Sequence, residues 1–415
     1  MFRRAPAWFW VAIALGAAIR FYLVVFTQGT ADVANWEAHA RGVHELGLFD
    51  YYQSSPKANH PPVILEAESL LWREAQLSGI PFRILLRAPF ALLDLAAAFV
   101  LLSLLHFRRW RFVLVAIYWL NPLSLIFSAY HGNTDSAVAF SLLLAIWLLS
   151  RGKIIGGALA LGIGLWIKLP GLLALPAFFF YLERWRQRLV FVLATAAVAL
   201  VGYALIFLRP DIVAANILGY HGGMLQTLGG VPAWGSRVLF FSLIAAPEKW
   251  PEYLHAPVVW WLQHNWQVAV VLGAGLSWLR RSRRSIQEFC ATIAMIYFVV
   301  YGLTDYWAFQ YLAWSLPFWF FLSPWLFVPA VIFASAYIYS LYWTLCGNPW
   351  LRGQWDFVGH RYWPEPVIVF RNAAVLFFFF SACAFLLSAS WNELSALVRK
   401  LIRPSRTAAT AVNRR

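Results

Sequence analysis

A short polar run between two apolar segments carries the residues best suited to chemistry. The run extends from His131 to Asp135, includes Asn133, and separates the apolar segments 112–130 and 136–149. Asn133 or Thr134 can cap the second segment as a helix, and Asp135 in its first turn suits the positive end of the helix dipole. We expect His131 and Asp135 to line a cavity rather than to bind a metal ion, because no third ligand is evident.

Asp32 is the candidate for proton chemistry. It follows the first apolar segment, 8–26, and precedes apolar residues that recur at helical spacing. A carboxylate held beside a cavity can act as general base on a sugar or lipid hydroxyl. The other interpretation is that Asp32 only caps the helix that follows it, and the spacing by itself favours this simpler role.

Two cations are candidates for binding a phosphate. Lys168 follows the short apolar segment 154–167, and Arg371 lies near the start of the last apolar segment, 367–390. Either side chain could make a charge-assisted hydrogen bond to a lipid-linked phosphate. The alternatives are a Lys168 side chain that snorkels to the membrane interface and an Arg371 that is a lone charge at a helix end.

Further polar residues occur at two other breaks between apolar segments. His60 precedes two prolines, which stiffen the backbone and present the imidazole at the mouth of the next apolar run. Asp305 and Tyr306 lie in a break between the apolar segments 286–304 and 307–322. We expect these residues to face the same cavity.

The composition identifies the class of protein that must position these residues. Hydrophobic residues make up 61% of the 415-residue chain and charged residues only 12%, whereas soluble globular proteins carry about 25% charged residues. The net charge of +15 comes mainly from basic residues in short loops, the positive-inside pattern of membrane proteins. We therefore expect an all-α polytopic membrane protein whose partners include membrane lipids and no nucleic acid.

The apolar segments predict a single transmembrane domain over residues 1–400, with about 11–13 helices. We expect the first external segment, 27–82, to form interfacial helices, and the second, 209–256, to hold a re-entrant piece at 238–246. Residues 401–415 are expected to form a basic, disordered cytoplasmic tail. With a cytoplasmic N-terminus, the candidate residues face the external or periplasmic side of the plasma (inner) membrane. The expected spans and short buried helices are 8–26, 83–105, 112–130, 136–149, 154–167, 171–182, 189–208, 257–279, 286–304, 307–322, 325–345 and 367–390.

The order of these features resembles the GT-C superfamily of polyprenyl-phosphate-sugar glycosyltransferases. The shared features are an Asp soon after the first span, an interfacial helix, a Tyr-Tyr pair and a His-Pro-Pro element. The block 119–176, with the polar run and Lys168, is similar to the catalytic subunit of the first GPI mannosyltransferase and to bacterial mannosyltransferase-like relatives. Gln310 and Tyr311 open a segment, running through Trp314 to Pro317, that is similar to the late (Arg or Gln)-Tyr-Leu…Trp…Pro element of the same group.

This resemblance implies a GT-C-type bundle and an inverting hexosyltransferase, with mannose as the first choice of sugar. The implied donor is a polyprenyl-monophosphate sugar and the acceptor a lipid-linked or glycan hydroxyl. Asp32 would be the base, and Lys168 and Arg371 would bind the donor phosphate. The cavity for donor and acceptor would include Glu37, His60, His131, Asn133, Asp135, Asp305, Tyr306, Gln310 and Tyr311.

The first external segment departs from the pattern of the superfamily at one point. Many relatives carry paired acidic residues there, whereas Val33 and Ala34 follow Asp32 and the nearest second acid is Glu37. A lone carboxylate suits a base better than a divalent-cation site, so no metal ion or other cofactor is expected. The alternatives are a lipid or lipid-linked-sugar transporter without chemistry and a subunit that depends on partners.

Overall fold

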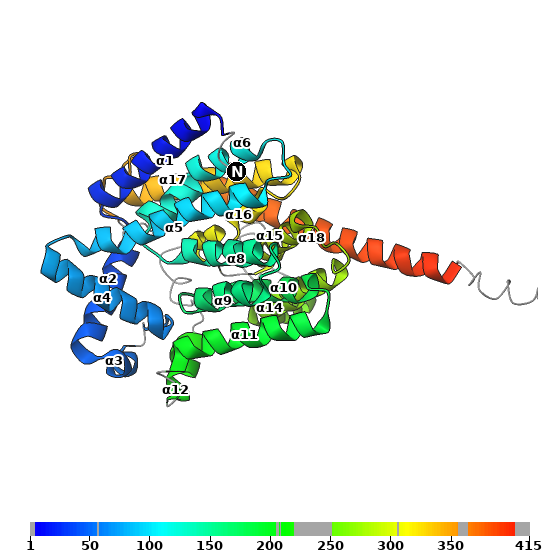
Figure 1. Ribbon diagram of the computed structural model, residues 1–415, viewed down its shortest axis with the longest axis horizontal. Coiled ribbons are helices and arrows are strands. Elements are labelled where there is room, and N and C mark those ends of the chain that lie inside the picture. Colours follow the sequence, from blue (N-terminus) through cyan, green and yellow to red (C-terminus); the bar gives the residue numbers. More distant parts are fainter. Residues whose placement is uncertain are drawn as a thin grey trace, which may run out of the picture.

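The structure is a computed structural model that describes residues 5–55, 58–204, 207, 209–219, 251–304, 307–355 and 364–402. Helices form most of this part of the chain, and it contains no strand. The long helices run side by side as a bundle, and the helices of the first external segment lie across one end of it (Figure 1). The prediction of an all-α polytopic membrane protein is confirmed.

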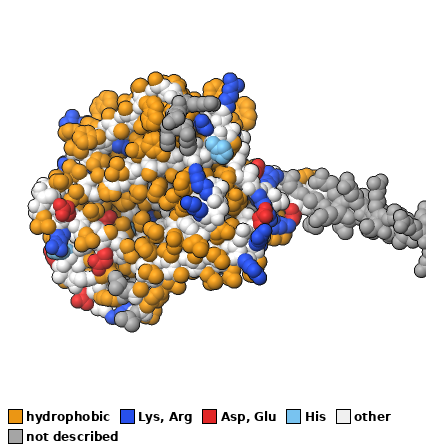
Figure 2. Space-filling model, in the orientation of Figure 1, with side chains coloured by type: hydrophobic (Ala, Val, Ile, Leu, Met, Phe, Trp, Pro, Cys, Tyr) orange, Lys and Arg blue, Asp and Glu red, His pale blue; other side chains and the backbone are white. Residues whose placement is uncertain are grey.

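Within the described residues, six helices are long and apolar enough to cross a membrane. A seventh span results if α6 (Arg111–Leu120) is counted together with the segment Pro122–Tyr130, which is bent from it by 49°. Figure 2 shows a broad band of hydrophobic side chains across the visible face of the bundle, as expected of a surface in contact with lipid. The six helices are α1 (Ala7–Phe26), α5 (Phe82–Leu104), α11 (Trp185–Tyr203), α15 (Ile286–Leu303), α17 (Pro324–Cys346) and α18 (Glu365–Ile402).

Shorter helices fill the bundle between these spans, which is why fewer long spans occur than the 11–13 expected. The two short helices expected between residues 154 and 182 are confirmed: α9 ends at Leu165, and a 3-10 turn separates it from α10. The pair is not wholly buried, because Ile155, Leu159 and Ile163 of α9 are exposed. Lys168 lies at this break. These shorter helices are α8 (Asp135–Leu149), α9 (Ile154–Leu165), η3 (Leu169–Ala174) and α10 (Leu175–Tyr181). The 28-residue α14 (Glu252–Leu279) is longer but is not among the six apolar spans.

The structure corrects one expected span. Residues 307–322 do not form a membrane helix; they fold into the 3-10 helix η8 (Phe309–Trp314) and the four-residue helix α16 (Leu316–Trp319). Their apolar character serves the core rather than contact with lipid, because the segment is almost entirely enclosed by protein. Its fully buried aromatic residues include Trp307, Trp314 and Trp319.

The first external segment folds into helices, as expected. It forms α2 (Ala31–Leu46), α3 (Leu48–Ser54) and α4 (Pro62–Ser78). In the second external segment, the described residues form α12 (Pro210–Ile212) and η5 (Val213–Leu218). The expected re-entrant piece at 238–246 and the tail from residue 403 lie outside the described residues.

A bend after α6 places the polar run of the sequence. Asn121 ends α6, and its Oδ1 accepts a hydrogen bond from Leu123 N at 2.8 Å. Pro122 begins the next helix, where its missing N–H removes no helical hydrogen bond. The chain continues through the π-helix η2 (Ile126–Tyr130), which ends at His131.

Arg87 of α5 joins the end of α1 to the end of η2. Its guanidinium donates hydrogen bonds to the carbonyls of Val24 (2.8 Å) and Thr27 (2.7 Å) in the last turn of α1. It also donates to the carbonyl of Tyr130 at 3.4 Å. These carbonyls are acceptors that a helix leaves unpaired at its end, so one side chain fixes the two segments from which the polar residues continue.

A buried ion pair holds α1, α5 and α6 together further along the bundle. Arg20 of α1 pairs with Asp94 of α5, and Tyr118 of α6 donates a hydrogen bond to the same carboxylate. Arg20 also donates to Ser124 Oγ at 2.5 Å, after the bend. Removing one partner of such a pair typically costs about 3–5 kcal/mol, so the network favours one packing of α1, α5 and α6.

Candidate active site

Asp32 lies in the first turn of α2, shortly after α1 ends. Thr30 is the N-cap of this helix: its Oγ1 accepts a hydrogen bond from Asp32 N (3.2 Å) and donates one to the carbonyl of His131 (2.6 Å). The interpretation that Asp32 only caps the helix is therefore wrong. Its side chain is 30% exposed, so the carboxylate is open to a ligand.

Two side chains of the polar run hold the Asp32 carboxylate. Asn133 Nδ2 donates to Asp32 Oδ2 at 2.6 Å, and His131 Nε2 lies 3.1 Å from the same oxygen. Burial by itself would raise the pKa of Asp32, but the His131 imidazole, the Asn133 amide and the Lys168 ammonium outweigh it and lower this pKa below its ordinary value. The group is therefore a carboxylate at neutral pH, ready to accept a proton.

The turn between His131 and Asn133 depends on a glycine. Gly132 has a φ of 76°, a conformation that residues with a side chain rarely adopt. A Cβ at this position would lie 2.4 Å from Cγ2 of Val33, the residue that follows Asp32. The glycine lets α2 and the polar run approach closely enough for both side chains to reach the carboxylate.

Tyr342 of α17 contacts His131 from the side away from Asp32. The Tyr342 hydroxyl lies 2.6 Å from His131 Nδ1, and both side chains are buried. The two residues are 211 positions apart in the sequence. We did not predict Tyr342 as a site residue, because no polar neighbour or motif distinguishes it within the apolar segment 325–345.

Lys168 and Asp135 form a second pair of charged residues. Lys168 Nζ donates to Asp135 Oδ1 at 2.8 Å, and the indole N–H of Trp314 donates to the same oxygen at 2.5 Å. Lys168 is 13% exposed and Asp135 only 1%. Asp135 Oδ2 is buried without a hydrogen bond. Trp314 was not predicted as a site residue.

Tyr311 and Gln310 lie next to this pair, on η8. The ring of Tyr311 stacks on that of Trp314, with centroids 3.9 Å apart, and the Lys168 ammonium lies 5.5 Å from the centre of the Tyr311 ring. Gln310 Oε1 is buried without a hydrogen bond partner among the described residues. The structure thus places the Tyr311 ring beside the cation, and Gln310 precedes Tyr311 on η8.

His60 belongs to the same group of polar residues. Its ring packs against that of Trp36 on α2, with centroids 4.2 Å apart. Burial, the Lys168 ammonium and His39 lower the pKa of His60 well below its ordinary value, against the opposing effect of Asp32. His60 is therefore neutral at neutral pH, and it lies within electrostatic reach of both Asp32 and Lys168.

The model of glycosyltransferase family 87 matches residues 77–304, more than half of the chain. The chain belongs to glycosyltransferase family 87. No curated protein matches it. The matched part of this family 87 chain contains the polar run and Lys168, whereas Asp32 lies before it and Gln310 after it. Family 87 is a family of GT-C-like membrane glycosyltransferases, so the chain is a membrane glycosyltransferase.

The other residues predicted for the site of this family 87 enzyme are Glu37, Arg371, Asp305 and Tyr306. Glu37 is exposed on α2. Arg371 is buried near the start of α18, where it donates to Asn372 Oδ1 at 2.9 Å and lies near Tyr337 of α17. Asp305 and Tyr306 lie outside the described residues.

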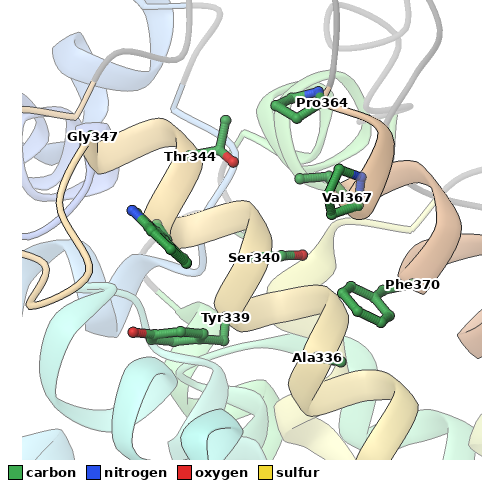
Figure 3. Close-up of a pocket in the computed structure, with 10 residues that line it drawn as sticks. Ala336, Tyr339, Ser340, Thr344, Gly347, Pro364, Val367 and Phe370 are labelled. Carbon is green, nitrogen blue, oxygen red and sulfur yellow. The ribbon is translucent and has the colours of Figure 1, made fainter.

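The protein surface also has an apolar groove between α17 and α18, with a volume of about 520 Å³. Figure 3 shows Tyr339, Ser340 and Phe370 among the side chains that line it. The α17 residues of this groove lie on another face of the helix than Tyr342. Because none of the described residues that line it is charged, this lining does not suit a phosphate.

Among the described residues, no three His, Cys, Asp or Glu side chains lie close enough together to hold a metal ion. The polar side chains of the site instead pair with one another. The Asp32 carboxylate contacts the Asn133 amide and the His131 imidazole, and the Asp135 carboxylate contacts the Lys168 ammonium. The arrangement can take up a proton at Asp32 and bind an anion at Lys168.

Proposed function

We propose that the protein is an inverting glycosyltransferase that moves a sugar from a polyprenyl-monophosphate donor to a lipid-linked or glycan acceptor. Mannose is our first choice of sugar. The observation that carries the proposal is the position of Asp32. Its carboxylate is ionised, partly exposed, and held by Asn133 beside the buried Lys168 ammonium.

The reaction would proceed by a single displacement at the anomeric carbon. The acceptor oxygen forms a bond to this carbon while the bond to the phosphate oxygen breaks, and the electron pair leaves with the polyprenyl phosphate. The acceptor proton passes to the Asp32 carboxylate, which acts as general base. Lys168 stabilises the growing charge on the departing phosphate, held in place by Asp135.

Transport without chemistry was the alternative reading of the sequence. Membership of a glycosyltransferase family favours the transferase. The site itself points the same way, because an ionised carboxylate held in one orientation is what a base requires.

The donor class can be tested directly with the purified protein in lipid nanodiscs. We expect labelled mannose to pass from polyprenyl-monophosphate mannose to a lipid or glycan acceptor, measured by chromatography of the labelled products. The same label supplied as a nucleotide sugar should not be transferred. Transfer from the nucleotide sugar alone would contradict the proposed donor, and transfer of glucose but not mannose would correct only the sugar.

The proposal also places the site on the outer face of the membrane, because the basic loops lie at the other end of the spans. We expect Ser78→Cys, exposed at the end of α4, to react with an impermeant maleimide on intact cells. Ser282→Cys, between arginines after α14, should react only after permeabilisation. The unmodified protein is the control, since Cys290 and Cys346 are buried and Cys383 is partly buried. The reverse labelling pattern would place the site on the cytoplasmic side.

A further inference from the structure

We propose that Tyr342 is a positioning residue for the reaction: it fixes the proton of His131 on Nε2, so that the imidazole orients Asp32 for proton transfer. This inference rests on the proposed function, since it requires Asp32 to be the base. Tyr342 would not touch either substrate. It would act through His131 on the carboxylate that does.

The geometry connects three separate elements in one line of contacts. The Tyr342 hydroxyl on α17 lies 2.6 Å from His131 Nδ1, and His131 Nε2 lies 3.1 Å from Asp32 Oδ2 on α2. Tyr342 is fully buried and His131 is 2% exposed, so water does not compete for the imidazole. Asp32 is the only member with substantial exposure, at 30%. The line therefore ends at the group that a substrate can reach.

The donors and acceptors along this line assign the tautomer. A neutral imidazole carries one N–H, and the other ring nitrogen accepts a hydrogen bond. An ionised carboxylate only accepts, so the nitrogen that faces Asp32 must carry the proton. His131 Nδ1 is then the acceptor, and the Tyr342 hydroxyl donates to it. A phenol that donates to Nδ1 favours this tautomer over the other, in which a lone pair on Nε2 would face the carboxylate.

The contact between His131 Nε2 and Asp32 is close but not well aligned without substrate, because Nε2 makes no hydrogen bond of good angle. Catalytic hydrogen bonds are often loose in the free enzyme and tighten in the complex. Asn133 holds the same oxygen from another direction, at 2.6 Å. A shorter hydrogen bond from His131 Nε2 to Asp32 Oδ2 would fix the plane of the carboxylate. Asp32 Oδ1 would then remain available for the proton of the acceptor hydroxyl.

Other charged and titratable groups face this line of contacts within the described residues. They are His60 before α4, Lys168 at the α9–η3 break, Asp135 on α8, Tyr130 on η2 and Tyr337 on α17. Any of them could influence the proton affinity of Asp32. A test of Tyr342 must therefore change its hydroxyl alone and keep the aromatic ring, which also packs against Phe127, Phe309 and Trp355.

Tyr342→Phe makes this change. We expect kcat with polyprenyl-monophosphate mannose to fall about tenfold, the usual effect of one lost hydrogen bond, with an unchanged KM. The acid limb of kcat/KM should move to higher pH, because a misplaced imidazole proton no longer stabilises the carboxylate and Asp32 is protonated more easily. Tyr339→Phe is the matched control: it removes a hydroxyl from the same helix, where the partner is the carbonyl of Pro349. It should leave both kcat and the pH profile unchanged.

A double-mutant cycle with His131→Gln separates positioning from packing. Glutamine can keep an N–H near the position of Nε2 but has no Nδ1, so Tyr342→Phe should have no further effect on kcat in this background. An equal loss in both backgrounds would overturn the inference, as would wild-type kcat and an unmoved acid limb in folded Tyr342→Phe. Asp32→Asn is measured alongside. If Asp32→Asn keeps normal turnover, Asp32 is not the base, and both the proposed function and this inference are wrong. If Asp32→Asn is inactive, the result for Tyr342→Phe tests the inference by itself.

Discussion

Asp32→Asn should lower kcat by roughly 10²–10⁴-fold, the usual contribution of a general base, while KM for the donor stays nearly unchanged. Asparagine has the size of aspartate and can still present an oxygen to Asn133, but it cannot take up a proton at neutral pH. The helix should not suffer, because Thr30 and not Asp32 is its N-cap. Steady-state kinetics with labelled polyprenyl-monophosphate sugar would measure the loss.

Glu37→Gln is the companion variant for this experiment. Glu37 is the nearest acid to Asp32 in the sequence, and it is exposed on α2. We expect nearly normal turnover, since a second carboxylate takes no part in the proposed mechanism. A loss as large as that of Asp32→Asn would show that two acids work together. Nearly normal turnover of folded Asp32→Asn would remove Asp32 from the mechanism.

Lys168→Ala should raise the KM for the donor by about 10–100-fold, because a hydrogen bond between charged groups contributes about 1.5–3 kcal/mol. The substitution also leaves Asp135 without its partner, and Asp135 is 1% exposed. An unpaired buried charge destabilises a protein by about 3–5 kcal/mol. Lower thermal stability is therefore expected as well, and kinetics alone would not separate the two effects.

A variant that removes both charges resolves this ambiguity. Lys168→Met combined with Asp135→Asn leaves no buried charge, and the asparagine can still accept the hydrogen bond from Trp314. We expect its melting temperature to recover most of the loss while KM for the donor stays high. Recovery of KM together with stability would mean that Lys168 only neutralises Asp135. The comparison requires melting curves and donor kinetics on the same preparations.

The sequence predicted those parts of the fold and site that depend on local patterns. Composition and apolar segments predicted the helical membrane bundle, and the short segments 154–167 and 171–182 predicted the break that holds Lys168. Asp32, His131 and Asn133 were all proposed as cavity residues, and the structure brings their side chains together. These residues could be recognised from the sequence because polar residues are rare in this apolar chain.

Residues that depend on packing were not predictable in this way. Tyr342 and Trp314 are aromatic residues in apolar segments of a chain with 17 Tyr and 24 Trp. Packing brings the Tyr342 hydroxyl against His131, 211 positions away, and the Trp314 indole N–H against Asp135, 179 positions away. Only these contacts make the two residues part of the site. Residues 307–322 were mistaken for a span for a related reason. An apolar sequence does not reveal whether it faces lipid or protein.

The hydrogen bonds of Arg87 have a consequence for protein engineering. They tie the last turn of α1 to Tyr130, while Thr30 binds the carbonyl of His131. Helices α2–α4 are thus not a unit that could be exchanged between relatives by themselves. A chimera that imports α2–α4 alone would replace Val33, which packs against Gly132, and so disturb the alignment of Asp32 with the polar run. The smallest transplantable unit joins the end of α1, α2, the first turns of α5 and the turn after η2.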